Sequence, residues 1–299
     1  MQTVWRRRFL FFGIVTSVFA VRFLIPILIV WISAPYLTFR EILMSFVGGS
    51  PATTAAIESV KPLILIFGGV FLLYLYFHWL FLEEKDPLFV ERYLSREHGA
   101  WFFAFAAVIL VLIMYFARYD PMMMLSAAVG SATFFILYGL RQTAEEQSRT
   151  GGSADLSDLS KFIYLEVLDA TFSFDGILGA FAFTTNLLLV LIGLGVGALV
   201  VRRLTVEGIE TVSRYRYLKN GALTSIGFLG FFMLIESYGF ELSSYVPIGV
   251  TFLLIGVAFI WSLKEMKEPP EWFRGLSGRQ DLWFYIKMNM IFLMNHGSF

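Results

Sequence analysis

The stretch KFIYLEVLDATFSFDGILGAFAFTTN, residues 161–186, governs how the whole chain is interpreted. It is apolar and long enough to cross a bilayer, yet it contains Glu166, Asp169 and Asp175. A carboxylate buried in hydrocarbon costs several kcal/mol unless it is paired, protonated or bound to a cation. Three acids in one apolar stretch therefore predict a polar site inside a membrane protein.

The composition favours an all-α, polytopic membrane protein. Of the 299 residues, 58% are hydrophobic and 15% are charged, whereas a typical globular domain has about 25% charged residues. Uncharged apolar runs of about 20 residues, the length that a helix needs to cross a membrane, recur along the chain. The absence of Cys excludes disulfides and thiolate-bound metals.

We expect about eight transmembrane helices in a single transmembrane domain, residues 1–299. The spans are 9–33, 62–82, 100–117, 122–140, the acidic stretch, 187–201, 222–237 and, last, 245–263. Connecting helices lie within 100–140, a Gly-containing polar linker covers 141–160, and the tail 264–299 is cytoplasmic or interfacial. Residues 34–59 are expected to form a loop with a short apolar patch.

The distribution of Lys and Arg orients this topology. The N-terminus and the loops on its side of the membrane carry 19 of the 23 basic residues. The loops on the other side carry 3, and Arg22 lies inside a span. Because cytoplasmic loops are enriched in Lys and Arg, we place both termini in the cytoplasm, with the protein in a bacterial inner membrane.

Two segments of the sequence predict an inverted repeat. Gly13 precedes Arg22 by nine residues, Gly193 precedes Arg202 by nine, and Val-Arg-x-Leu closes both segments. The first repeat is 1–82 and the second is 161–240, and the odd number of helices between them gives the copies opposite orientations. Inverted repeats are typical of secondary transporters, although chance similarity between Gly-rich helices is the alternative. The first copy is incomplete, so a sister acidic helix is expected upstream of residue 1, in a longer protein.

The acidic stretch offers a set of oxygen ligands. On an ideal helix Glu166, Asp169 and Ser173 share one face. Gly176 and Gly179 would loosen the helix and turn Asp175 toward the same pocket, where Asn186 adds an amide oxygen. Such a set suits Mn²⁺, Mg²⁺ or Ca²⁺, and a proton pathway is equally compatible. Snorkelling or helix capping is the structural alternative for the first two acids.

The motif Glu166-x-x-Asp169-x-x-Phe172-x-x-Asp175 resembles the second acidic motif of the TerC family, known for tellurium resistance. The resemblance implies a LysE-related inverted-repeat cation transporter with manganese efflux as its activity. It also implies that Asp169 and Asp175 are metal ligands supported by Glu166. The family's first acidic motif has no counterpart here.

The sequence therefore predicts a divalent cation transporter that works by alternating access, with proton exchange left open. The alternative is a membrane assembly or metalation factor that binds metal and partner proteins without transport. No enzymatic constellation, prosthetic group or nucleic-acid partner is expected, and the lipid bilayer is the surrounding medium. His78 is interpreted as an interfacial partner of Trp79, Glu236 as a solvated helix end, and Glu83 as part of a solvated face.

Overall fold

The computed structural model describes five long helices and parts of the segments between them. The described residues are 51–83, 88, 99–149, 176–184, 186, 188–198, 200, 215–240, 242–243 and 245–266, with 27, 28, 31, 38 and 40–42. All regular structure within these ranges is helical, which confirms the predicted all-α class. The predicted spans in 9–33 and 161–175 lie almost entirely outside the described residues.

Helix α4, Pro51–Leu82, contains the predicted span 62–82 and begins eleven residues before it. The predicted loop at 34–59 is therefore wrong from residue 51 onward. Pro51 suits the first position of a helix, where its missing N–H is not needed, and the alanines that follow favour helix in water as well as in lipid. Hydropathy detects only the part of this helix that is apolar.

Helices α5, Gly99–Phe116, and α6, Pro121–Arg149, form an antiparallel pair. A short turn joins them, and Oδ1 of Asp120 accepts the N–H groups of Met122 at 2.9 Å and Met123 at 3.2 Å, which caps α6. The predicted linker from residue 141 is wrong as far as Arg149. RQTAEEQSR is polar, but it is built mostly of good helix formers.

Helices α9, Leu218–Ser237, and α10, Tyr245–Glu265, confirm the predicted spans 222–237 and 245–263 within a few residues. Gly239 follows α9 with φ of +89°, a left-handed conformation that glycine adopts without steric cost. Its N–H donates to the carbonyl of Glu236 at 3.0 Å. This turn ends α9 and starts the chain back toward α10.

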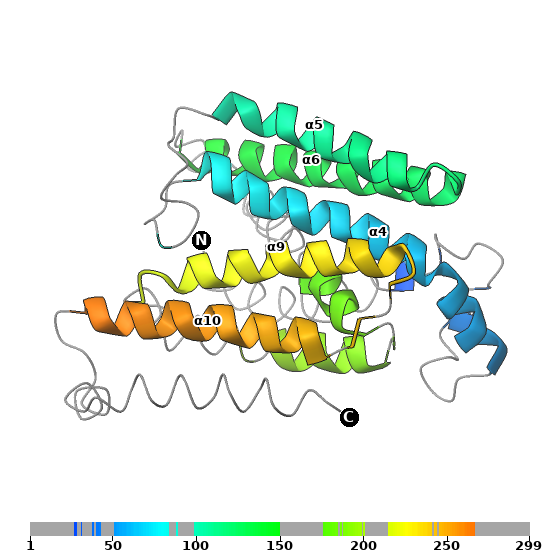
Figure 1. Ribbon diagram of the computed structural model, residues 1–299. Coiled ribbons are helices and arrows are strands. Elements are labelled where there is room, and N and C mark those ends of the chain that lie inside the picture. Colours follow the sequence, from blue (N-terminus) through cyan, green and yellow to red (C-terminus); the bar gives the residue numbers. More distant parts are fainter. Residues whose placement is uncertain are drawn as a thin grey trace, which may run out of the picture.

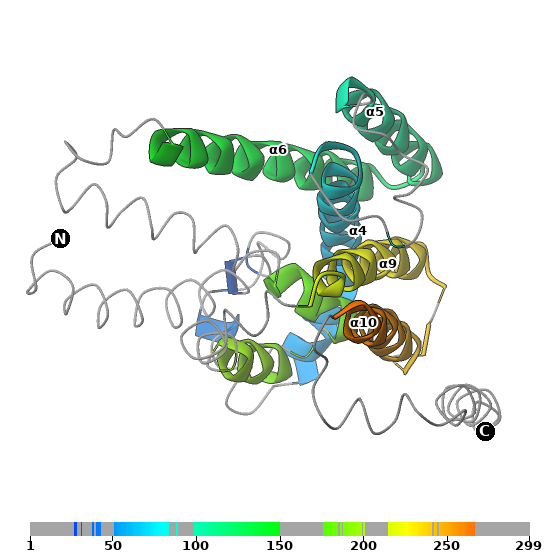
Figure 2. The same cartoon turned by 90° about the vertical axis from the view of Figure 1, so that its left-hand side faces the viewer.

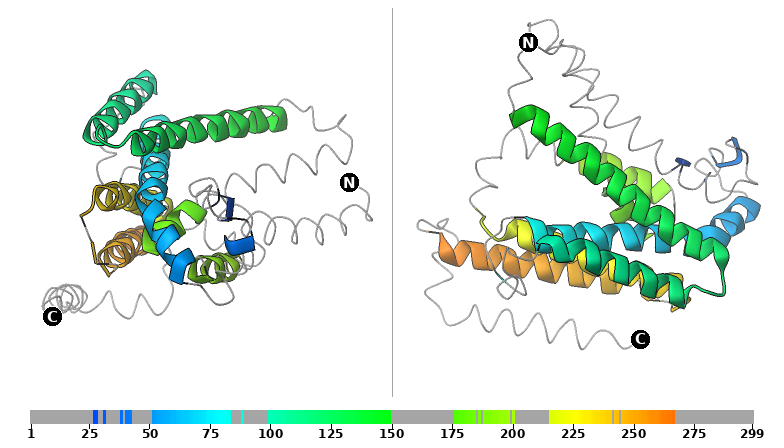
Figure 3. Two further views of the ribbon diagram at one scale, coloured as in Figure 1. Left: turned by 90° about the vertical axis from the view of Figure 1, so that its right-hand side faces the viewer. Right: turned by 90° about the horizontal axis from the view of Figure 1, so that it is seen from above.

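Helix α4 lies at the centre of the described part, with α5 and α6 on one side and α9 and α10 on the other (Figure 1). The view along the bundle shows α9 between α4 and α10, and α6 extending away from the other helices (Figure 2). Figure 3 shows from above how α6 crosses α4 at an angle while α9 and α10 run alongside it. Each helix is thus placed by its contact with α4 or with α9.

Within the described part of the chain, four helices are long and apolar enough to cross a membrane, namely Glu58–Leu82, Pro121–Thr143, Leu218–Ser237 and Tyr245–Glu265. Trp101–Phe116 and Leu188–Ala198 are shorter apolar helices. The outward faces of α5, α6 and α10 carry large exposed apolar side chains such as Val111, Ile136 and Phe252. Such faces suit lipid and not water, so the chain is a multi-pass membrane protein.

Glycines allow α4 and α9 to approach closely. A Cβ on Gly230 would lie 2.9 Å from the backbone N of Leu73 and 3.0 Å from the carbonyl O of Gly69. One on Gly227 would lie 2.6 Å from the ring of Tyr76. Helices in lipid gain little from apolar burial, so close packing at small residues is a main source of their association.

Tyrosine hydroxyls attach α5 to the rest of the bundle. The hydroxyl of Tyr74 on α4 donates to the carbonyl of Ala106 at 2.6 Å, and that of Tyr238 donates to the carbonyl of Ile113 at 2.8 Å. Burial raises the pKa of Tyr238. The two bonds lie about two helical turns apart along α5, so they hold it at two separate levels.

We predict that Gly230→Ala destabilises the protein by about 1–3 kcal/mol, because the added Cβ meets backbone atoms that cannot move aside. Thermal unfolding in detergent measures the loss. Gly256→Ala on α10 is the matched control, since nothing lies within 4 Å of that position, and it should be neutral or slightly stabilising. Equal effects of the two substitutions would contradict this account of the crossing.

Candidate functional site

Most of the predicted ligand set lies outside the described residues. Glu166, Asp169, Ser173 and Asp175 belong to this group, so their convergence on one site stays a prediction. Within the described ranges, no group of three or more His, Cys, Asp or Glu side chains is arranged to hold a metal ion. The described residues instead show what surrounds the end of the acidic stretch.

The helical segment 176–183 follows Asp175 directly and enters the core of the protein. Ile177 and Leu178 are fully buried there. Cδ2 of Leu178 lies 3.5 Å from the position of a Cβ on Gly68, near the middle of the membrane span of α4. The residues immediately after the third acid therefore pack at about mid-membrane depth.

Asn186 is exposed and caps a helix. Its Oδ1 accepts the N–H of Leu189 at 3.2 Å, and its own N–H donates to Oγ1 of Thr184 at 3.1 Å. An N-cap of this kind satisfies donors that the first turn leaves open. A carbonyl oxygen retains a second lone pair, so the ligand role of Asn186 stays a prediction.

Two ion pairs join α4 and its C-terminal flank to the two ends of α9. Nζ of Lys61 donates to Oε1 of Glu236 at 2.5 Å, and Nζ of Lys219 donates to Oε2 of Glu83 at 2.5 Å. Lys61 lies in α4 and Glu83 follows its last residue, and the 22 residues that separate them correspond to about 33 Å along the helix, close to the thickness of a bilayer core. One pair therefore lies near each face of the membrane, with the glycine crossing between them.

These pairs correct two sequence interpretations. Glu236 is not a solvated helix end, and Glu83 is not part of a solvated face, because each carboxylate is mostly buried and bound to a Lys of the facing helix. The pattern Lys-x7-Gly-x13-Glu occurs at Lys61, Gly69 and Glu83 and again at Lys219, Gly227 and Glu241. It contains Glu241 and not Glu236, so it does not indicate the partner of Lys61.

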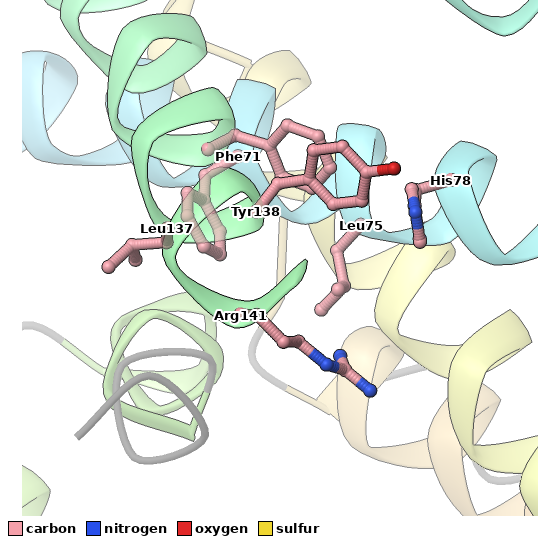
Figure 4. Close-up of a pocket in the computed structure, with 7 residues that line it drawn as sticks. Phe71, Leu75, His78, Leu137, Tyr138 and Arg141 are labelled. Atoms are coloured by element: carbon pink, nitrogen blue, oxygen red, sulfur yellow. The ribbon is translucent and has the colours of Figure 1, made fainter. Parts of the chain in front are cut away.

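A small cavity of about 30 Å³ lies between α4 and α6 (Figure 4). Aromatic and aliphatic side chains form most of its wall, and three polar residues join them. The lining residues are Phe71, Leu75, His78, Phe134, Leu137, Tyr138 and Arg141. The cavity is large enough for one or two water molecules.

His78 lines this cavity and also lies next to the carboxylate of Glu83, which is paired with Lys219. Its ring centroid lies 4.7 Å from that of Tyr138, and it meets Phe102 of α5 edge-on at 5.7 Å. Its Nδ1 lies 3.8 Å from Oε1 of Glu83. The predicted pairing with Trp79 missed these contacts, which come from helices distant in the sequence.

A family model described as "Protein of unknown function (DUF475)" matches residues 1–268. The chain belongs to this family. The resemblance to the TerC family, which extended over most of residues 9–262 and was specific at the ten-residue acidic motif, is therefore wrong. Spacings of three residues between acids arise on any helix that carries them on one face. No curated protein and no solved structure matches this DUF475 chain.

Manganese efflux, tellurium resistance and the ligand roles carried over to Asp169 and Asp175 were implied by the TerC resemblance. They no longer follow from it. What remains is the chemistry of the residues themselves. The acids, the buried segment after them and the paired helices α4 and α9 are properties of this DUF475 chain, independent of any other family.

We predict a measurable coupling between Lys61 and Glu236. A double-mutant cycle with Lys61→Ala and Glu236→Ala should give about 0.5–1 kcal/mol, since the pair is only partly exposed, and high salt should reduce it. Thermal unfolding in detergent is the measurement. Arg216 and Glu265, at 3.8 Å and more exposed, form the control pair, for which we expect a smaller coupling. Purely additive effects at Lys61 and Glu236 would contradict the assignment.

Proposed function

We propose that this protein carries a divalent cation across the bacterial inner membrane, with the carboxylates of the acidic stretch as ligands. One observation carries the proposal. The segment that begins one residue after Asp175 packs against Gly68, near the middle of a membrane-spanning helix. Transported ions bind near the bilayer midplane in many secondary transporters, and a carboxylate at that depth needs a cation or a proton.

The proposed ligands determine the class of ion. Glu166, Asp169 and Asp175 are hard oxygen donors, and Ser173 and Asn186 add neutral oxygens. Mn²⁺, Mg²⁺ and Ca²⁺ prefer such ligands, whereas thiolate-seeking metals find no Cys in this chain. Protons can compete for the same carboxylates, which would couple cation transport to proton movement.

The proposal includes an inverted repeat in which α4 and α9 are equivalent helices. Gly227 follows Gly69 by 158 residues, as Lys219 follows Lys61. A Cβ on Gly69 would meet Leu234 at 2.8 Å and one on Gly227 would meet Tyr76 at 2.6 Å, and Leu234 follows Tyr76 by the same 158 residues. Equivalent residues therefore make equivalent contacts across the pair, which supports two halves related by a two-fold axis.

The orientation of the protein is part of the proposal. Four described basic residues, Arg141, Arg216, Lys219 and Lys264, lie where α6 leaves the bundle, α9 begins and α10 ends. The positive-inside rule makes this the cytoplasmic end. The pair between Lys61 and Glu236 then lies near the outer face, and a rocking motion about the glycine crossing would alternate access between the two faces.

We predict that Asp175→Asn abolishes cation flux, because the amide keeps the size of the side chain but lacks the charge that binds the ion. The full chain is reconstituted in liposomes that contain a dye sensitive to Mn²⁺, and the initial rate of uptake is measured. Flux of the variant should fall to that of protein-free vesicles.

Asp120→Asn is the control, since Asp120 is exposed on the turn before α6 and Asn caps a helix as well as Asp does. Its flux should equal that of the unmodified protein. Unchanged flux in Asp175→Asn would overturn the proposal. Mn²⁺ binding without flux in the unmodified protein would favour the metalation or assembly role instead.

A further inference from the structure

Arg118 lies in the turn between α5 and α6 and contacts two tyrosine rings. Its guanidinium carbon lies 4.5 Å from the ring centroid of Tyr115 and 4.5 Å from that of Tyr119. Nη1 donates to the carbonyl of Tyr115 at 3.4 Å, and Nη2 donates to the hydroxyl of Tyr119 at 2.8 Å. These contacts hold the charged group in place without using all of its N–H donors.

The contacts of Arg118 do not connect distant parts of the chain. The two tyrosines lie three residues before it and one residue after it. The lysine pairs between α4 and α9, in contrast, join residues 175 and 136 positions apart. No described carboxylate forms an ion pair with Arg118, and Asp120 directs Oδ1 at the N–H groups that begin α6. The guanidinium is therefore available to a ligand from outside the chain.

The surroundings of Arg118 place it at the surface of a bilayer. The membrane-spanning part of α6 begins with the first residue of that helix, and the apolar part of α5 ends at Phe116. The large side chains beside the turn are mostly exposed: Tyr115 58%, Phe116 67%, Tyr119 85% and Met122 63%. Such a face suits lipid, and a cation at its edge lies at the depth of the headgroups, where tyrosine is also common.

We propose that Arg118 binds the phosphate group of a phospholipid at this face of the membrane. The donors that remain on its planar guanidinium suit phosphate oxygens, and a guanidinium is less strongly hydrated than an ammonium. Because the tyrosines already hold the side chain in place, binding costs less side-chain entropy. With the orientation proposed above, the lipid belongs to the outer leaflet. The proposal does not rest on cation transport, since it concerns only the contact between the turn and the bilayer.

The test measures whether phospholipid gathers at the turn. The chain has no Cys, so Met122→Cys carries a single fluorophore close to Arg118. The full-length protein is reconstituted in vesicles of digalactosyl diglyceride, a neutral lipid without phosphate, with a small fraction of phosphatidylglycerol that has brominated acyl chains. Bromine quenches the fluorophore at short range. We expect severalfold more quenching than the same fraction of brominated digalactosyl diglyceride gives, and Arg118→Gln should remove this excess.

Tyr245→Cys gives the matched control position, since Tyr245 is 82% exposed and begins α10 at the end of the bundle where α6 begins (Figure 1). We expect no excess quenching by phosphatidylglycerol there. Equal quenching by the two brominated lipids at Met122→Cys would overturn the proposal without use of any Arg118 variant. An excess that persists in Arg118→Gln, or that is as large at Tyr245→Cys, would contradict it as well. Inorganic phosphate in the buffer should not reduce the excess, and its loss would show a site for a free anion instead of a lipid.

Discussion

The structure depends on the close approach of helix backbones at glycine. The contacts of the central helix with α9 and α6 each use one: Gly230 of α9 meets α4, and Gly130 of α6 would place a Cβ 2.5 Å from the carbonyl O of Phe67. Gly221 of α9 similarly meets Leu254 and Ala258 of α10. In lipid, where apolar burial gives little net driving force between helices, these approaches allow extensive van der Waals contact. The spacing of the backbones determines where the aromatic rings and the ion pairs can lie.

The α4–α9 pair combines a tight centre with polar ends. The centre excludes water and has little freedom to slide, because glycine backbones and the ring of Tyr76 interlock there. The ends are held by single ion pairs near the membrane faces, where partial exposure makes each pair weak. Separating α4 and α9 at one end therefore costs less free energy than separating them at the centre. This arrangement suits a protein that must change shape while remaining assembled.

Hydropathy predicted the described spans because a helix that crosses a membrane must be apolar over a fixed length. It failed for the first turns of α4 and the last turns of α6, where the helix continues beyond its strongly apolar part. It could not predict that Glu83 binds Lys219, since that pairing depends on which helices are neighbours. The partners of His78 come from α5 and α6 for the same reason. The acidic stretch was conspicuous in sequence because charges in an apolar run are rare, but charge alone does not show how side chains converge.

The short connection between α5 and α6 has a consequence for how this protein is made. Asp120 accepts two backbone N–H groups, and its own N–H donates to the carbonyl of Ala117 at 2.9 Å, so the reversal is completed within a few residues. Neither helix can then lie far from the other at any stage after the turn has formed. The two are expected to enter the bilayer together as a helical hairpin during synthesis. A change at this turn would therefore lower the yield of inserted protein more than the stability of molecules already folded.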